Sequence, residues 1–549
     1  MPHPRLAAAA AAALVLLTAS PVLACGGLFC ARIPVDQTGE KILFAADGKT
    51  VTAHVEIAYK GEAKDFSWIL PVPTPPTLEV GSDSLFAALR QASQPQFQLA
   101  LRDEGPCAPP PMPVYKSAPS ATGSVSRRAK DEVKVISQGV VGPYDTAVLQ
   151  ANQPGVLKDW LRKNKYVIPP KLDPLLDPYV AGKYSFVALK LTKDKAVGDI
   201  QPIVMTYKAT KPGIPIRLTG VAATNDMDIF VWVLGSQHAI PENYRHAQIN
   251  EARIDWIGGG GNYKQVVTRA VDEAGGQAFV TDYAGPSDVV PSERFTRAHY
   301  KLDSLAKKTD PAEFAEAVVE TGFFGERYGA LNQESLVAFL KKYIRKPKSL
   351  AKMDDMTFYR FIADHREALH EAGIKVDTKK AIAELDAKVV KPAEHIHQLF
   401  DRFHYMTAMY TTMSPQEMTQ DPLFRFNATL ADVPAIRKAN GVRRCSKGVP
   451  YWQTPIEITL ANGRKFTVPG GGEPYWRRRY RGPTSDLPAA ERVEQLTVNG
   501  PPVVIQDNAR AIDAALAEAP EPSDNRWYGG VAAGLLLLGG LGWGLRRRR

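Results

Sequence analysis

The chain lacks the short motifs that identify the commonest hydrolases and metalloproteases. Its 549 residues contain no G-x-S-x-G and no H-E-x-x-H, so neither a serine nucleophile elbow nor a two-histidine zinc helix is indicated. Residues 47–50 (DGKT) end like a phosphate-binding loop, but such a loop needs a glycine where Leu43 stands. The four glycines at 258–261 lack the dinucleotide-binding spacing and follow no clear strand. The sequence therefore names no reaction.

Cysteine is scarce as well, and the chain has only Cys25, Cys30, Cys107 and Cys445. No pair has C-x-x-C spacing, which argues against a thioredoxin-like redox role and against a zinc site. An even number of cysteines in an exported chain favours disulfides. Of the three connectivities, we expect Cys25–Cys30, which closes a small loop, with Cys107–Cys445, which joins distant segments.

The N-terminus carries an apolar run rich in Ala and Leu. It follows Arg5 and ends in the triplet Val22-Leu23-Ala24. Its length and its small residues predict a removable signal peptide at 1–24, not a spanning helix. Cleavage after Ala24 would leave Cys25 as the first residue of the mature chain. Lipidation of Cys25 is the less favoured alternative, because Leu23 is bulky where a lipoprotein signal prefers a small residue.

The C-terminus carries a second apolar run at residues 527–545, without charge and followed by four arginines. At ~1.5 Å per residue the run is about 28 Å long, close to a hydrocarbon core of ~30 Å. We predict a single transmembrane helix at 527–545, a cytoplasmic tail at 546–549 and a body outside the cytoplasm. The run also resembles bacterial sorting tails, through Gly529-Gly530 and the arginines, and in that case the tail is cleaved.

The charge of the chain is mildly positive. The formal net charge is +10, of which Arg5 and the four terminal arginines contribute half. The basic run at 477–481 can contact phosphates or anionic envelope polymers, although a solvated loop is the more ordinary interpretation. We do not infer a nucleic-acid partner.

The first half of the chain has the pattern of β-structure. Residues 42–45 and 51–59 flank Asp47-Gly48, a pair that predicts a hairpin turn. Pro, Ser and Ala predominate at 105–130, which predicts an exposed loop or linker. We predict helices at 83–92 and 154–164, and further strands at 65–70, 133–136, 144–149, 184–192, 204–207, 216–222 and 229–234.

The second half changes to a helical pattern and then returns to β-structure. A capping box at residues 414–417 predicts a short helix, and Asn462-Gly463 predicts a hairpin between strands at 456–460 and 465–468. The fold class is therefore α+β, with a strand-rich N-terminal half containing antiparallel hairpins, a helical segment at about 306–420 and a short C-terminal β-hairpin region. The expected helices lie at 311–321, 333–342, 355–372, 378–389 and 392–410.

These patterns divide the chain into regions in sequence order. After the signal peptide we expect a strand-rich region at 25–104, the loop at 105–130, strands at 131–300, helices at 301–425, a mixed region at 426–518 and a spacer at 519–526.

One group of side chains suggests metal chemistry. On the helix predicted at 392–410, His397, Asp401 and His404 stand at i, i+4 and i+7 and share one face. Two imidazoles and a carboxylate suit a divalent transition metal. The outer Cα atoms are about 10.5 Å apart along such a helix, so one ion reaches both histidines only under strain. An ion pair on a solvated face is the ordinary alternative.

Several stretches together resemble the bacterial family catalogued as domain of unknown function 2330. They are ACGGLFC at 24–30, DFSWILPVP at 65–73, IRLT at 216–219, SPQEM at 414–418 and DPLF at 421–424. The resemblance covers most of the exported body. It implies no catalytic or binding residue and no chemistry.

Two hypotheses follow from these patterns. The first is an uncharacterised exported, membrane-anchored protein that binds, or makes structural contacts, at the cell envelope. Its partners would be the membrane, through the C-terminal helix, and an envelope protein or polymer, and it would need no cofactor. The second is an extracytoplasmic metal-dependent hydrolase that uses His397, Asp401 and His404 with a divalent transition metal.

Overall fold

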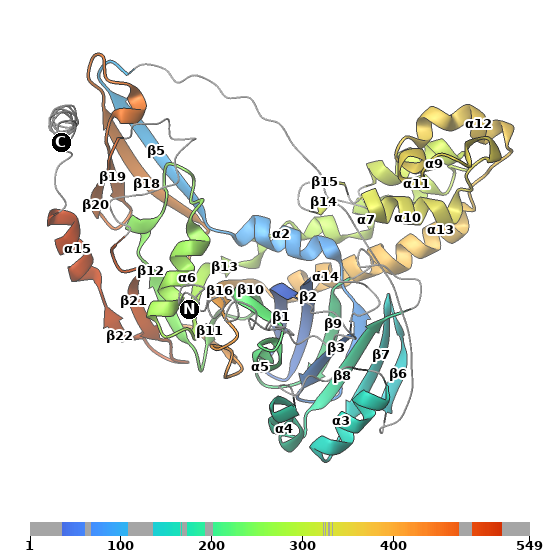
Figure 1. Ribbon diagram of the computed structural model, residues 1–549, viewed down its shortest axis with the longest axis horizontal. Helices are drawn as coiled ribbons and strands as arrows, with labels where there is room; N and C mark the ends of the chain where they lie inside the picture. The colour runs from blue at the N-terminus through green and yellow to red at the C-terminus, as the bar shows by residue number, and fades with distance from the viewer. Residues whose placement is uncertain are drawn as a thin grey trace, which may run out of the picture.

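The computed structural model describes residues 36–60, 67–107, 135–164, 166, 173–192, 201–321, 323, 326–327, 330–331, 333–470 and 486–518. Its central feature is a ten-stranded sheet that gathers strands from both halves of the chain (Figure 1). The strand order is β22-β21-β12-β13-β16-β10-β1-β2-β9-β4. In this order their bounds are Val503–Asp507, Ala490–Gln495, Arg245–Ile249, Ala278–Pro286, Tyr405–Met413, Ala223–Gly235, Asp36–Ala46, Thr50–Lys60, Ile203–Lys208 and Thr77–Val80.

A second sheet packs on half of the first one. Its order is β3-β8-β7-β6, all antiparallel. Apolar side chains of β1 and β2, such as Ile42 and Val55, share one core with Leu70, Val187 and other residues of the second sheet. The two sheets therefore form a sandwich. The strands of the second sheet are Ser67–Val72, Ser185–Leu191, Tyr144–Gln150 and Val135–Val141.

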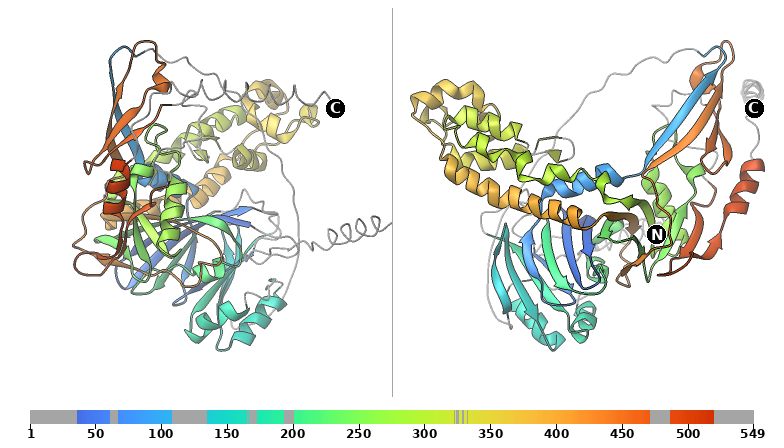
Figure 2. Two further views of the ribbon diagram at one scale, coloured as in Figure 1. Left: turned by 60° about the vertical axis from the view of Figure 1, so that its left-hand side comes forward. Right: turned by 180° about the vertical axis from the view of Figure 1, so that it is seen from behind.

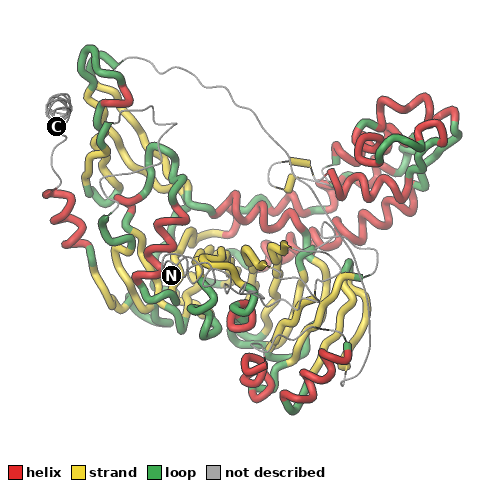
Figure 3. Tube along the Cα trace, viewed as in Figure 1, coloured by secondary structure: helices red, strands yellow, loops and turns green. Residues whose placement is uncertain are grey.

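Helices cover the outer faces of this sandwich. Helices α3 (Pro154–Lys163) and α4 (Asp173–Ala181) pack on the second sheet through Trp160, Tyr179 and their neighbours. On the other side, α2 (Asp83–Ser93) packs against β1 and β10. The helical lobe stands between β13 and β16 in sequence and projects away from the sheet (Figures 2 and 3). Its longer helices are α9 (Pro311–Glu320), α10 (Gln333–Tyr343), α11 (Asp355–Arg360), α12 (Arg366–Glu371), α13 (Thr378–Leu385) and α14 (Lys391–Arg402).

A four-stranded sheet forms an arm on the opposite side of the molecule from the helical lobe (Figure 1). Its order is β20-β19-β18-β5, with bounds Lys465–Val468, Ile456–Leu460, Ile436–Arg444 and Gln96–Glu104. Strand β5 runs parallel to β18, so residues separated by more than 300 positions lie side by side. Helices α6 (Tyr263–Glu273) and α15 (Ala509–Glu518) lie near this arm (Figure 1). A cystine joins Cys107 to Cys445, with a Cα–Cα distance of 5.2 Å.

Both predicted hairpins are confirmed. Strands β1 and β2 pair antiparallel, and Gly48 in their turn has φ +81°. Strands β19 and β20 pair in the same way, with Gly463 at φ +85°. Positive φ is the conformation for which glycine is favoured. The mixed α+β class and the strand-rich N-terminal half are also observed.

The helix predicted at 392–410 is wrong in its second half. Helix α14 ends at Arg402, and residues 405–413 are strand β16, which pairs with β10 and β13 in the middle of the large sheet. The segment YMTAMYTTM is rich in tyrosine and threonine, which favour strands. The predicted helical segment at 306–420 therefore ends at 402, and strands from both halves of the chain share one sheet.

Three smaller predictions also need correction. Residues 216–222 are not a strand, because the segment between Pro215 and Gly220 forms the four-residue helix α5, Ile216–Thr219. The capping box at 414–417 closes only a turn, in which the Ser414 N–H donates to a Glu417 carboxylate oxygen at 2.6 Å. The helix predicted at 355–372 is interrupted by a 3₁₀ segment, Ile362–His365.

The predicted signal peptide, the Cys25–Cys30 pair and the apolar run at 527–545 lie outside the described residues. Within the part of the chain that the structure describes, no helix combines the length and apolarity needed to cross a membrane.

Candidate functional site

The sandwich encloses a cavity of about 320 Å³ between its two sheets. This volume lies at the lower end of the range for small-molecule sites, ~300–1,000 Å³, and is about twice that of an engineered ~150 Å³ cavity that binds benzene. Apolar side chains from β1, β2, β3 and β9 form most of the wall. The apolar lining residues are Ile42, Phe44, Ala53, Val55, Leu70, Pro71, Val72, Pro73, Met205, Ala209, Gly213, Ile214, Pro215 and Leu423. The polar lining residues are Glu40, Tyr179, Tyr184, Tyr207, Thr210, Lys211 and Asp421.

Glu40 is the unusual residue of this cavity. It precedes Ile42 and Phe44 at two-residue spacing on β1, so its side chain joins theirs inside the sandwich. A β-bulge stands just before it, where the register shifts between Gln37 and Gly39 in both neighbouring pairings. Bulges commonly re-aim a side chain next to functional sites.

The carboxyl group of Glu40 is buried, and one of its oxygens is unpaired. The side chain is 2% exposed, and Oε2 has no hydrogen-bond partner among the described residues. Burial raises the pKa of Glu40 from 4.5 to about 7, and a hydrogen bond with the Thr219 side chain offsets part of the rise. A buried polar atom without a partner is costly and calls for an explanation.

A second carboxyl group, that of Asp421, lies at the same end of the cavity. Its Oδ2 accepts from the Tyr179 hydroxyl at 2.5 Å, and its Oδ1 accepts from the Arg217 N–H at 3.1 Å. Burial raises the pKa of Asp421, and these hydrogen bonds limit the rise. Both Glu40 and Asp421 bond to helix α5, through Thr219 and Arg217 respectively, so the two acids lie near each other.

Cationic side chains lie at the loop side of the cavity. Lys211 Nζ donates to Glu242 Oε2 at 2.6 Å, and Arg425 Nη1 donates to Glu242 Oε1 at 3.1 Å. These ion pairs lower the pKa of Glu242 against the effect of its burial. Lys211 is therefore already paired, and the unpaired acceptor inside the cavity remains that of Glu40.

The lining of this cavity suits binding. Its residues include no histidine, cysteine or serine, so a serine or cysteine nucleophile with a histidine base is not found among the described lining residues. An apolar wall with a few placed polar groups is the usual character of a ligand pocket.

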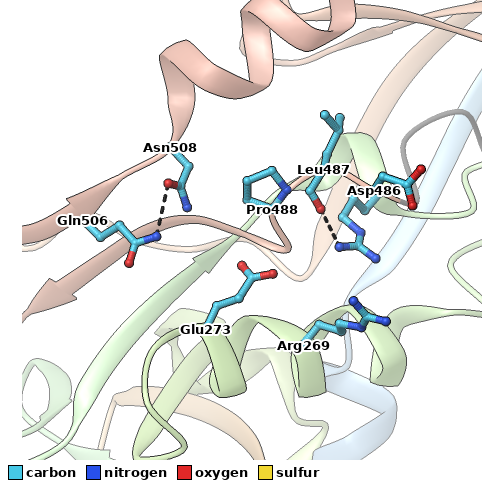
Figure 4. Close-up of a pocket in the computed structure, with 8 residues that line it drawn as sticks. Arg269, Glu273, Asp486, Leu487, Pro488, Gln506 and Asn508 are labelled. Atoms are coloured by element: carbon cyan, nitrogen blue, oxygen red, sulfur yellow. Dashed lines mark hydrogen bonds between the residues drawn. The ribbon is translucent and has the colours of Figure 1, made fainter.

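A larger cavity, of about 610 Å³, lies between α6 and the start of β21 (Figure 4). Four of its polar side chains, those of Arg253, Glu273, Gln506 and Asn508, already make hydrogen bonds within the local fold. Glu273 accepts from the N–H groups of Ala489 and Ala490 at 2.8–2.9 Å, and Arg253 donates to the Leu487 carbonyl at 2.6 Å. Gln506 donates to Asn508 at 3.2 Å across the other wall. We therefore regard this cavity as the weaker candidate.

The proposed metal ligands do not converge in one place. On α14, His397 Nε2 lies 3.4 Å from Asp401 Oδ2. This contact matches the alternative interpretation, an ion pair on a solvated helix face. His404 follows the end of α14 and is exposed. Among the described residues, no group of three His, Cys, Asp or Glu side chains is placed to hold a metal ion. The prediction that the three residues share one helical face is wrong, because α14 ends at Arg402, before His404.

The cystine agrees with one predicted pairing. Cys107 and Cys445 are bonded, and they connect the ends of β5 and β18. The Cys445 N–H also donates to the Glu104 carbonyl at 2.7 Å.

Sequence reasoning missed Glu40, Tyr179 and Asp421 as site residues. One signal was present in the sequence. Glu40 stands two residues before Ile42 and four before Phe44, so it shares the alternation of the apolar residues in β1. Three of the stretches that carry the family resemblance also meet at the cavity: Leu70–Pro73 and Asp421 with Leu423 line it, and Thr219 bonds to Glu40.

Residues 20–293 match the family model described as "Uncharacterized protein conserved in bacteria (DUF2330)", and this part of the chain belongs to that family. The match includes β1, β2, β3, α4, α5 and β9 and ends before Asp421. No curated protein and no solved structure matches the chain.

Proposed function

We propose that the protein is a binding protein of the bacterial cell envelope, and that its ligand is a small, largely apolar molecule held in the sandwich cavity. The observation that carries this proposal is the combination of an apolar cavity with a buried carboxyl oxygen that has no hydrogen-bond partner among the residues that the structure describes. A bound ligand that donates to this oxygen would remove the cost of its burial.

The location outside the cytoplasm is part of the proposal. It is supported by the apolar runs at both ends of the sequence and by the bond between Cys107 and Cys445, because disulfides persist in oxidising compartments. The C-terminal run would hold the body at the membrane, unless the tail is cleaved.

Filling the cavity tests the binding function. Ala53 lines the cavity and is buried, so Ala53→Phe places a ring where the ligand would lie. We expect the affinity for the apolar fluorescent dye N-phenylnaphthylamine to fall roughly tenfold or more. Overpacking itself costs about 1–3 kcal/mol, which a domain of this size tolerates.

Ala45→Phe is the matched control. Ala45 stands on β1 and faces the core on the opposite side of the sheet, next to α2. We expect similar destabilisation but unchanged dye binding. Equal dye binding in wild type and a folded Ala53→Phe protein, or no dye binding by the wild type, would contradict the proposed function. If Ala53→Phe does not fold, Ala53→Leu gives a milder version of the same comparison.

The redox state of the arm tests the location. In protein taken directly from cells, Cys107 and Cys445 should resist alkylation until a reductant is added, as measured by mass spectrometry. Two thiols that react without reduction would argue for a reducing compartment.

A further inference from the structure

We propose that the ligand carries a hydrogen-bond donor, an amine or a hydroxyl, at the end that reaches Glu40, and that the cavity discriminates against ligands that end in a carboxylate. This inference rests on the proposed function and specifies the chemical class of its ligand.

The first argument is the hydrogen-bonding capacity at this end of the cavity. Within the described part of the chain, Glu40 Oε2 is the buried acceptor of this cavity without a partner, whereas both oxygens of Asp421 already accept hydrogen bonds. A ligand that supplies an N–H or O–H group would give Glu40 Oε2 a hydrogen-bond donor. A ligand without a donor displaces solvent from the cavity and gives Glu40 Oε2 no hydrogen bond in return, so the cost of burying that oxygen is not offset.

The second argument is charge. Two carboxyl groups, Glu40 and Asp421, line the cavity. The positive charge of Arg217 acts on Asp421 and Lys211 is engaged by Glu242, so Glu40 is the carboxyl group without a cationic partner among the described residues. A carboxylate head would enter a site that already holds two acids and would have to be buried beside them. An ammonium head would instead form a charge-assisted hydrogen bond with ionised Glu40.

The third argument is shape. Glu40, Ile42 and Phe44 line the cavity in succession along β1, over about 13 Å at ~3.3 Å per residue. The apolar part of the ligand would therefore be elongated and extend from Glu40 toward Phe44.

A series of ligands with one tail and different heads tests this assignment. Decylamine, decanol, decyltrimethylammonium and decanoate would compete with the dye for the full-length protein at pH 8. We expect decylamine and decanol to bind roughly tenfold or more tightly than decanoate. Decyltrimethylammonium separates charge from hydrogen bonding, because it is a cation without an N–H group, and it should bind more weakly than decylamine.

Glu40→Gln identifies the group responsible. This variant keeps an acceptor oxygen but loses the charge, so the preference for decylamine over decanoate should fall by roughly tenfold. Asp282→Asn is the matched control, since Asp282 is an equally buried carboxyl that does not line the cavity, and it should keep the wild-type preference.

The outcomes separate the inference from the proposed function. Equal affinity for all four heads, tightest binding of decanoate, or an unchanged preference in Glu40→Gln would overturn the donor-headed ligand and leave the apolar cavity as a binding site. Failure of all four ligands and of the dye to bind would overturn both.

Discussion

Two buried carboxyl groups in the same ten-stranded sheet, Glu40 and Asp282, have nearly the same electrostatic character and different surroundings. Their side chains are 2% and 5% exposed. Burial raises the pKa of each to about 7. A β-bulge lies just before Glu40, between Gln37 and Gly39, and Asp282 is itself the residue skipped in the pairing of β13 with β16.

The difference lies in partners and in space. Asp282 accepts a hydrogen bond from the Tyr263 hydroxyl, and the positive charges of Arg437 and Arg90 act on it. Glu40 Oε2 has no partner among the described residues, and it faces a cavity. A raised pKa reports burial in both places. What distinguishes a candidate binding site from a structural carboxyl group is an oxygen without a partner among the described residues that also lines a cavity.

The largest effect should come from Glu40→Gln. The folded-state pKa is about 7 against an ordinary 4.5, so the contribution of Glu40 to stability is fully present below pH 4.5 and is lost as the pH rises through 7. The loss amounts to about 3 kcal/mol. The variant should therefore match the wild type near pH 4.5 and be more stable by up to that amount at pH 8.

Denaturant unfolding of both proteins across this pH range measures the difference. If the difference in unfolding free energy between wild type and variant does not change with pH, Glu40 is not protonated in the folded protein near neutrality. Asp282→Asn should have a pH effect of the same sign, because the pKa of Asp282 is also raised. The pH dependence alone therefore does not separate the two sites.

Ligand-linked stability should separate them. At a decylamine concentration of about 100 times Kd, binding stabilises the folded state by about 2.7 kcal/mol. We expect this gain in the wild type and in Asp282→Asn, and a smaller gain in Glu40→Gln at the same concentration. Thermal unfolding with and without ligand provides the measurement, and an equal gain in all three proteins would remove the distinction between the two carboxyl groups.

Removing the donor to Asp282 should affect stability alone. In Tyr263→Phe the carboxyl group loses its hydroxyl partner, at a cost of about 2 kcal/mol, and the pKa of Asp282 should rise further because that hydrogen bond lowers it. Decylamine affinity should stay within error of the wild-type value. A clear loss of affinity would place Asp282 in the binding machinery.

The smallest effect should come from Tyr179→Phe. This change removes the hydroxyl hydrogen bond to Asp421 and leaves those from the backbone N–H groups of Arg217 and Ile216. We expect a cost of about 1 kcal/mol in unfolding free energy and a higher pKa for Asp421, because the lost bond lowers it. A destabilisation several times larger would indicate that this bond holds α4 on the sandwich.

Local patterns predicted much of the fold. The turn pairs Asp47-Gly48 and Asn462-Gly463 located two hairpins, because glycine at positive φ is a strong local signal. The pairing of Cys107 with Cys445 was also expected from the sequence. The order of strands in the large sheet was not predictable, because β16 pairs with β10, and β21 with β12, only through contacts between residues far apart in the sequence.

The candidate site depended on the same long-range contacts. The helix predicted at 392–410 included Thr407 and Tyr410, but those residues belong to β16, where the neighbouring strands override the local pattern. Glu40 lay outside the strand predicted at 42–45, whereas β1 begins at Asp36 and includes it. Its significance arises only when β3, α5 and residues 421–423 close around it.

A crystal structure of the protein with decylamine tests the central claim most directly. The account predicts the tail between the two sheets along Ile42 and Phe44, with the nitrogen at hydrogen-bond distance, about 2.8 Å, from Glu40 Oε2. Decylamine bound elsewhere on the molecule, or an unchanged cavity at saturating ligand, would contradict it.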